Sequence, residues 1–226
     1  MSATALPELS LIETRVLGVL VEKQLTVPDT YPLTLNALVA GCNQKTSRDP
    51  VLNTTEGEVQ AALDALRALS LVVESYGASG RVMRYAQNID KVMHVPAPVV
   101  ALLATLMLRG PQTPGELRGN CDRLYRFPDI SALEAYLEEM AARPSGALAV
   151  RLPKQPGSRE HRYAHLLSGT PEAAAAMTDP SLQGSGEHAD LQADVAQLRG
   201  EVAELRRLVN HLFAELGVER SPDGQG

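Results

Sequence analysis

The sequence predicts an α+β protein that is mainly α-helical and carries small β-hairpins. Three observations favour this class. Helix-capping residues stand before apolar stripes of helical period, two pairs of short β-rich runs flank turn residues, and a heptad pattern occupies the C-terminal region. With 226 residues, 44% of them apolar, the chain is long enough for two small folded domains and a tail.

The first helix is predicted at residues 11–24. Ser10 and Glu13 form a capping box, and the apolar positions Ile12, Val16, Val19 and Leu20, together with Lys23, fall on one helix face. The prolines that follow predict a loop. Thr34 then caps a short helix that Gly41 ends.

A long polar loop follows, and it leads into the best-patterned helix of this half of the chain. Thr55 and Glu58 form a second capping box, and the apolar stripe behind it consists of Val59, Ala62, Leu63, Leu66 and Leu69. The runs LVVESY and RVMRYA then flank the glycine-bearing residues 77–80, a pattern typical of a β-hairpin. Three helices followed by a hairpin is the order of a winged-helix domain, predicted at residues 8–92.

The same order recurs at residues 96–168. PVVALLATLML is helical, Thr113 with Glu116 caps a short helix, and Ser131 with Glu134 caps a third; ALAVRL and REHRYAHL form a second hairpin. Three residues of the first half recur 79 positions later: Thr34, Leu38 and Cys42 correspond to Thr113, Leu117 and Cys121. This spacing indicates an internal duplication, with coincidence among common residue types as the alternative.

Beyond the second domain, residues 169–188 are rich in Ala, Gly, Ser and Pro and are predicted to be a flexible linker. Residues 189–217 are predicted to form a coiled-coil helix, because apolar residues recur there at alternating spacings of four and three. Valine at the a positions and leucine at the d positions favour a parallel homodimer. The expected dimerisation residues are Val195, Leu198, Val202, Leu205, Val209 and Leu212. The alternative is an amphipathic helix that folds back onto its own domains.

The net charge of −6 is distributed unevenly. Residues 1–95 carry eight basic and ten acidic residues, residues 96–168 carry nine and seven, and residues 169–226 carry four and ten. The middle segment is therefore mildly basic, and the C-terminal segment is the most acidic. A pI near 5.4 argues against strong non-specific binding to nucleic acid.

Nothing in the sequence forms a catalytic or metal-binding pattern, so we expect neither enzymatic activity nor a cofactor. Cys42 and Cys121 are expected to be small buried residues, and His161 and His165 to be structural or surface histidines. The start of the chain lacks a signal peptide, and no apolar run approaches the length of a membrane span. The sequence therefore predicts a cytoplasmic protein that does not enter the membrane.

The third helix of each predicted domain turns an acidic face outward, which counts against docking in the major groove of DNA. The cations lie instead on the polar loop and the hairpins. The candidate nucleic-acid or partner-binding residues are Asn43, Gln44, Lys45, Arg48, Arg81, Arg84, Lys154, Gln155, Arg159 and Arg162. Two alternatives are that these cations are merely solvated, or that Arg48 and Asp49 pin the loop to its own domain.

The leading functional hypothesis is a dimeric protein that binds duplex DNA, in the role of a transcription regulator, through the loop and hairpin cations. The alternative is a scaffold or accessory factor that holds a protein partner on the same surfaces. The low pI and the acidic helix faces favour this alternative.

Several strings resemble the YceH-like family of uncharacterised bacterial proteins. They are CNQKTSRDPV at 42–51, EGEVQAALD at 56–64, TPGELR at 113–118 and PKQPGSREHRYAHL at 153–166. The resemblance covers roughly residues 8–168, and it implies two tandem winged-helix domains in a bacterial cytosolic protein. It supplies no activity, substrate or catalytic residue.

Overall fold

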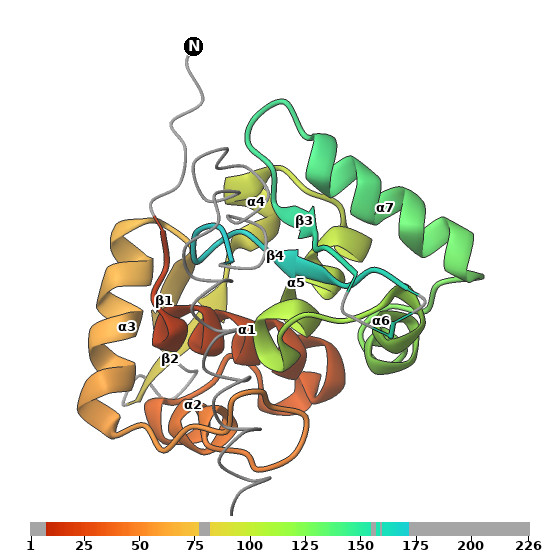
Figure 1. Cartoon of the computed structure of the whole chain (residues 1–226). Helices are drawn as coiled ribbons and strands as arrows, with labels where there is room; N and C mark the ends of the chain where they lie inside the picture. Colours follow the sequence, from red (N-terminus) through yellow and green to blue (C-terminus); the bar gives the residue numbers. More distant parts are fainter. Residues whose placement is uncertain (1–7, 77–81, 155–156, 159, 172–226) are drawn as a thin grey trace, which may run out of the picture. The chain divides into compact units, whose positions relative to one another are not determined.

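The computed structural model describes residues 8–76, 82–154, 157–158 and 160–171, which all belong to one compact unit (Figure 1). The elements in chain order are α1 (Leu11–Thr26), the 3-10 helix η1 (Pro28–Thr30), α2 (Leu35–Cys42), α3 (Glu56–Ala68), β1 (Val72–Tyr76), β2 (Met83–Gln87), α4 (Ile89–Met93), α5 (Ala97–Arg109), α6 (Pro114–Cys121), α7 (Ile130–Ala142), β3 (Ala149–Arg151) and β4 (Tyr163–His165). The predicted class, mainly helical with two small antiparallel hairpins, is confirmed. The expected coiled coil at 189–217, its dimerisation residues and most of the linker lie outside the described residues.

The 79-residue repeat is present in the structure. Helices α2 and α6 each have eight residues, begin 79 positions apart and are capped by Thr34 and Thr113. A single β-bridge joins Leu33 to Tyr85 in the first repeat, and Gln112 to Tyr163 in the second, so the residue before the cap is tied to the hairpin both times. We refer to residues 8–87 and 97–167 as the first and second repeats.

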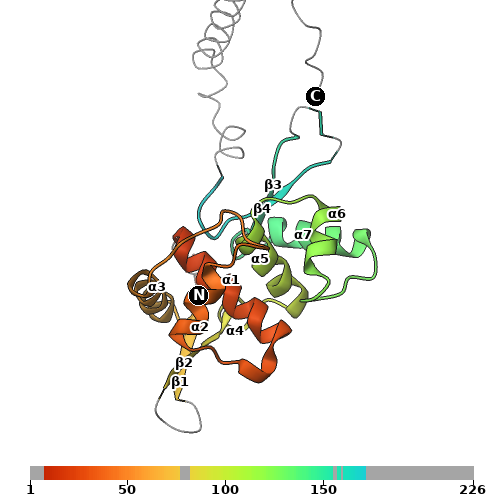
Figure 2. The ribbon, with the colours of Figure 1, turned by 90° about the horizontal axis from the view of Figure 1, so that it is seen from below.

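The hairpins are short and antiparallel. In the first, β1 and β2 pair from Val72–Gln87 to Tyr76–Met83, and in the second, β3 and β4 pair from Ala149–His165 to Arg151–Tyr163. Figure 2 shows the two hairpins leaving the helices on opposite sides. A single rigid partner surface would therefore meet one hairpin at a time.

The middle of helix α1 is buried on every side, whereas the sequence predicts one buried face. Each residue from Thr14 to Val21 is buried, because α2 and α3 pack on one side of α1 and α5 packs on the other (Figure 2). The approach of α5 is close: a Cβ atom on Gly18 would lie 3.0 Å from the Leu108 side chain. The first helices of the two repeats thus form the central contact of the unit.

The two repeats share one hydrophobic core. Fully buried leucines from both repeats meet in it, among them Leu20 of α1, Leu63 of α3, Leu103 of α5 and Leu137 of α7. Burial of such side chains is the main stabilising term of a fold, at about 1.5–3 kcal/mol for each. The predicted domains are therefore two packed halves of one compact unit.

Three predicted capping boxes, at the starts of α1, α3 and α6, are confirmed. The predicted cap of α7 is wrong. Asp129 caps this helix, accepting a hydrogen bond from the backbone N–H of Ala132 at 2.7 Å, and Ser131 lies inside the first turn. An aspartate two residues earlier competes successfully because its carboxylate is also a strong N-cap acceptor. The short helix α4 was not predicted.

Candidate partner-binding surfaces

The polar loop between α2 and α3, residues 43–55, is closed at its base by Asn43. The Asn43 Nδ2 atom donates to the Thr54 carbonyl at 2.8 Å, and its Oδ1 atom accepts from the Thr54 N–H at 2.7 Å and hydroxyl at 2.9 Å. Both ends of the amide are therefore occupied within the loop. The structure gives Asn43 an architectural contact rather than a free binding group.

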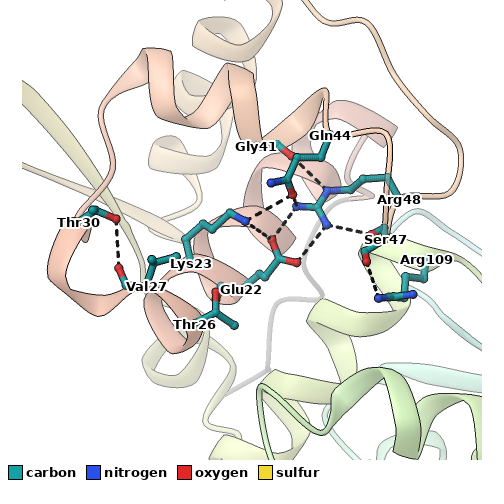
Figure 3. A network of polar contacts seen from close by, with 10 residues as sticks. All are labelled: Glu22, Lys23, Thr26, Val27, Thr30, Gly41, Gln44, Ser47, Arg48 and Arg109. Carbon is teal, nitrogen blue, oxygen red and sulfur yellow. Dashed lines mark hydrogen bonds and ion pairs between the residues drawn. The ribbon is translucent and has the colours of Figure 1, made fainter.

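Arg48 anchors the middle of this loop, and its side chain is 0% exposed. Its guanidinium forms an ion pair with Glu22, with one N–O distance of 2.6 Å, and donates to Gln44 Oε1 at 2.7 Å (Figure 3). It also donates to the carbonyls of Gly41 and Ser47 at 3.1 and 2.9 Å. An arginine has five N–H donors. Two hydrogen bonds to Glu22 and one each to Gln44, Gly41 and Ser47 use all five. Arg48 therefore has no donor left for a phosphate.

The Glu22–Arg48 pair also sets the ionisation of Glu22. Burial would raise the pKa of this carboxyl, but the hydrogen bonds and charge of Arg48 outweigh burial and, with those of Lys23, lower the pKa below its usual range. Lys23 lies 3.0 Å from Glu22 and donates to Gln44 at 3.4 Å. Gln44 thus belongs to the same internal network, which holds the loop against α1.

A second arginine, Arg15 of α1, holds the first half of the same loop. It is 0% exposed and donates to the carbonyls of Cys42 at 3.1 Å and Pro50 at 2.6 Å. Burial is the main cause that lowers the pKa of Arg15, and the neighbouring charge of Arg48 adds to it. Arg15 is not among the residues that the sequence singles out, because nothing in a helical pattern distinguishes a buried arginine from a solvated one.

Of the loop residues predicted to bind a partner, Lys45 alone is exposed and has no hydrogen bond or ion pair with the other described residues. The loop reaches the second repeat instead. The N–H of Asp49 donates to the Leu108 carbonyl at 2.8 Å, and Arg109 donates to the Ser47 hydroxyl at 2.6 Å (Figure 3). The loop is therefore a connector between the repeats, as well as between two helices.

The predicted hairpin cations lie on two separate surfaces. Arg84 is half-buried and donates to the carbonyl of Pro32 at 2.7 Å, within the first repeat. Arg162 forms a long ion pair with Glu116 at 3.4 Å, within the second repeat. Lys154 is exposed. The remaining predicted binding residues, Arg81, Gln155 and Arg159, lie outside the described residues.

The predicted acidic faces of the third helices are confirmed. On α3, Glu56, Glu58 and Asp64 are exposed. The cation on this face, Arg67, is held between Asp64 at 3.3 Å and Glu74 of β1 at 3.0 Å. On α7, the exposed charged residues are Glu138 and Glu139. Both faces therefore present carboxylates to solvent.

The cysteines and histidines have structural environments. Cys42 and Cys121 are fully buried, and burial raises the pKa of Cys42 to about 11 and also raises that of Cys121. Burial lowers the pKa of His165 to about 4, and His161 Nδ1 lies 2.9 Å from the Leu152 carbonyl. Within residues 8–171, omitting the undescribed positions, no three His, Cys, Asp or Glu side chains are grouped to hold a metal ion.

Together these features define a class of protein: two packed repeats of three helices and a hairpin, joined through an internally anchored polar loop. A family model described as "Protein of unknown function, DUF480" matches residues 9–158. The chain belongs to this family, so the resemblance to uncharacterised bacterial proteins is confirmed. None of the described helices has the length and apolar character needed to cross a membrane.

Bacterial relatives match almost the whole chain. The UPF0502 protein of Dechloromonas aromatica is 58% identical over 209 residues, which cover 92% of this chain and 97% of its own. The UPF0502 proteins of Burkholderia multivorans and Leptothrix cholodnii are 51% and 50% identical, over 97% and 95% of this chain. The names of these relatives state no activity or ligand.

Proposed function

We propose that this protein is a tandem winged-helix protein that acts as a protein-interaction module rather than as an enzyme. The order of three helices and a hairpin in each repeat supports the winged-helix assignment. The bridges Leu33–Tyr85 and Gln112–Tyr163 support it further, because each supplies a short strand before the second helix that pairs with the hairpin.

The acidic outward faces of α3 and α7 carry this proposal. A helix that enters the major groove brings cations toward the phosphates, whereas α3 presents Glu56, Glu58 and Asp64. Its one cation, Arg67, is already shared between two carboxylates. Such a face repels DNA and attracts a lysine- or arginine-rich segment of a protein partner.

A parallel coiled coil at residues 189–217 would give each assembly two copies of these faces. Doubling a modest charged surface raises the overall affinity for a partner that is itself multivalent. Light scattering of the full chain at micromolar concentration tests this part of the proposal. The expected mass is that of a dimer, and a monomer mass would reject it.

Affinity capture from nuclease-treated bacterial lysate tests the partner surface. The bait is the full chain, compared with a variant that carries Glu56→Lys and Asp64→Lys. The matched control is Asp29→Lys, which changes an exposed carboxylate on η1, away from the α3 face. We expect a stoichiometric protein that the wild type and the control retain and the α3 variant loses. Equal capture by all three baits would reject the α3 face as the surface.

DNA binding is the second candidate, favoured by the exposed Lys45 and Lys154 and by the winged-helix order. Contacts would then go to the phosphate backbone, so affinity should fall steeply as salt rises. Lys45→Ala and Arg159→Ala are suitable variants, whereas Arg48→Ala is not, because Arg48 is buried in the fold. Binding to duplex DNA that neither salt nor these variants change would reject this candidate.

A further inference from the structure

A polar pocket of about 290 Å³ lies where the first repeat's loop meets the second repeat. Its lining includes Ser47, Asp49, Arg109, Gln112, Glu116 and Arg162. The pocket plays no part in the acidic α3 surface proposed above.

Of the three arginines that line this pocket, Arg109, the last residue of α5, forms the fewest hydrogen bonds with the residues that the structure describes. It donates one hydrogen bond, to the Ser47 hydroxyl at 2.6 Å, and forms no ion pair with any other residue that the structure describes. Burial is the main cause that lowers the pKa of Arg109; the charge of Glu22 opposes this effect and that of Arg48 adds to it. A guanidinium stays charged even so. A half-buried positive charge therefore faces the pocket with unused donors.

The walls around Arg109 are held in place by their own hydrogen bonds. Gln112 is 4% exposed, its Nε2 donates to the carbonyls of Thr105 and Gly110 at 3.3 and 3.2 Å, and its Oε1 accepts from Asn120 at 2.7 Å. On the other side, Arg48 donates to the Ser47 carbonyl at 2.9 Å and so fixes the backbone of Ser47. The pocket is thus preformed, which reduces the entropy lost when a ligand binds.

We propose that this pocket binds a small phosphate monoester, whose phosphate group contacts Arg109 and Arg162. Arginine suits a phosphate because its planar N–H groups match two oxygens at once. The lining carboxylates Asp49 and Glu116 accept hydrogen bonds from hydroxyl groups on the rest of the ligand. The volume lies near the lower limit of about 300 Å³ for small-molecule sites, so the ligand is a small metabolite-sized molecule.

Isothermal titration of the full chain with inorganic phosphate and with glycerol 3-phosphate, each at matched ionic strength in sodium chloride, tests the proposal. We expect glycerol 3-phosphate to bind at least as tightly as phosphate. Arg109→Gln should weaken binding by about tenfold or more, the loss expected for one charge-assisted hydrogen bond. Arg126→Gln removes an exposed cation outside the pocket and should leave binding unchanged.

Asp49→Asn provides a second test that does not depend on the stability of the Arg109 variant. It removes an exposed negative charge from the pocket while the Asp49 backbone contact stays. Inorganic phosphate carries no glycerol hydroxyl groups for Asp49 to contact, so its binding should tighten. The proposal is overturned by an absence of binding, by an Arg109→Gln variant that binds like the wild type, by an Asp49→Asn variant that binds inorganic phosphate no tighter, or by glycerol 3-phosphate binding more weakly than phosphate. These results would leave the α3 partner surface untouched, because none of its residues lines the pocket.

Discussion

In each repeat a loop joins the second helix to the third, but the first loop is anchored by a buried ion pair and the second by a buried aromatic side chain. The first spans residues 43–55 and the second residues 122–129, so the first is five residues longer. At the 79-residue offset, Arg48 corresponds to Phe127. Arg48 is buried in an ion pair with Glu22, whereas Phe127 is buried against the rings of Tyr125 and Tyr136, with centroid distances of 4.9 and 6.0 Å.

The difference shows why the first loop is so polar. Its extra length carries Ser47 and Asp49 to the end of α5, where they bond to Arg109 and Leu108 of the other repeat. An aromatic side chain could fill the space but could not satisfy the backbone carbonyls that this excursion leaves inside the protein. Arg48 satisfies the carbonyl of Ser47, together with that of Gly41 in α2, and ties both to Glu22 of α1.

Arg48→Ala should have the largest effect on stability. It leaves the Glu22 carboxylate, which is 16% exposed, without its main partner, and breaking a buried pair in this way costs about 4 kcal/mol. Urea unfolding of the full chain measures the loss. Lys45→Ala, three residues away on the exposed part of the loop, is the matched control and should stay within about 0.5 kcal/mol of the wild type. A loss below about 1 kcal/mol for Arg48→Ala would show that the ion pair does not anchor the loop.

Phe127→Ala should cost about 3 kcal/mol, because it removes a buried aromatic ring and leaves a cavity. The conservative changes should separate the two loops. Phe127→Leu keeps most of the volume and should cost less than about 1.5 kcal/mol of stability. Arg48→Lys loses the planar fork that reaches four partners, so it should cost more than Phe127→Leu. Equal losses for the two conservative variants, measured by the same unfolding assay, would contradict the contrast between the loops.

Asn43→Ala should cost about 2 kcal/mol, because it leaves the buried backbone groups of Thr54 without their partner. Its counterpart at the 79-residue offset is Asp122, which is exposed and forms a long, exposed ion pair with Arg126 at 3.5 Å. Asp122→Ala should therefore change stability by about 0.5 kcal/mol or less. Thermal unfolding of the two variants tests the difference, and similar losses would mean that the first loop is not closed by Asn43.

The parts of the fold that the sequence predicts correctly depend on neighbours in sequence. Capping boxes such as Ser10 with Glu13 act over three residues, and the acidic outward face of α3 follows from the helical period. The burial of α1 on all sides was missed because it depends on α5, about 80 residues further along the chain. The shared core of the two repeats is not visible in the sequence for the same reason.

The loop residues proposed as a binding site show a similar limit. In sequence, Asn43, Gln44 and Arg48 look like free polar groups, because their long-range partners Glu22 and Thr54 carry no signal that points to them. The alternative that Arg48 pins the loop describes its contacts in the structure. Arg15 and Arg109 could not be found at all, because an arginine inside or at the end of a helix is normally solvated.

Acidification should affect the polar loop and leave the aromatic one alone. The pKa of Glu22 is lower in the folded protein than in the unfolded chain, where it is about 4.3. Its contribution to stability is therefore fully present above the unfolded pKa and is lost as the pH falls through the folded pKa.

The comparison is between the wild type and Glu22→Gln, in which all other carboxyls are the same and their effects cancel. The difference in the free energy of unfolding between the two should shrink between about pH 7 and about pH 3, whereas the difference between the wild type and Phe127→Ala should stay constant. A Glu22→Gln difference that does not change with pH would mean that Arg48 holds the loop through hydrogen bonds that a neutral amide replaces, and that the charge of Glu22 has no part in the anchor.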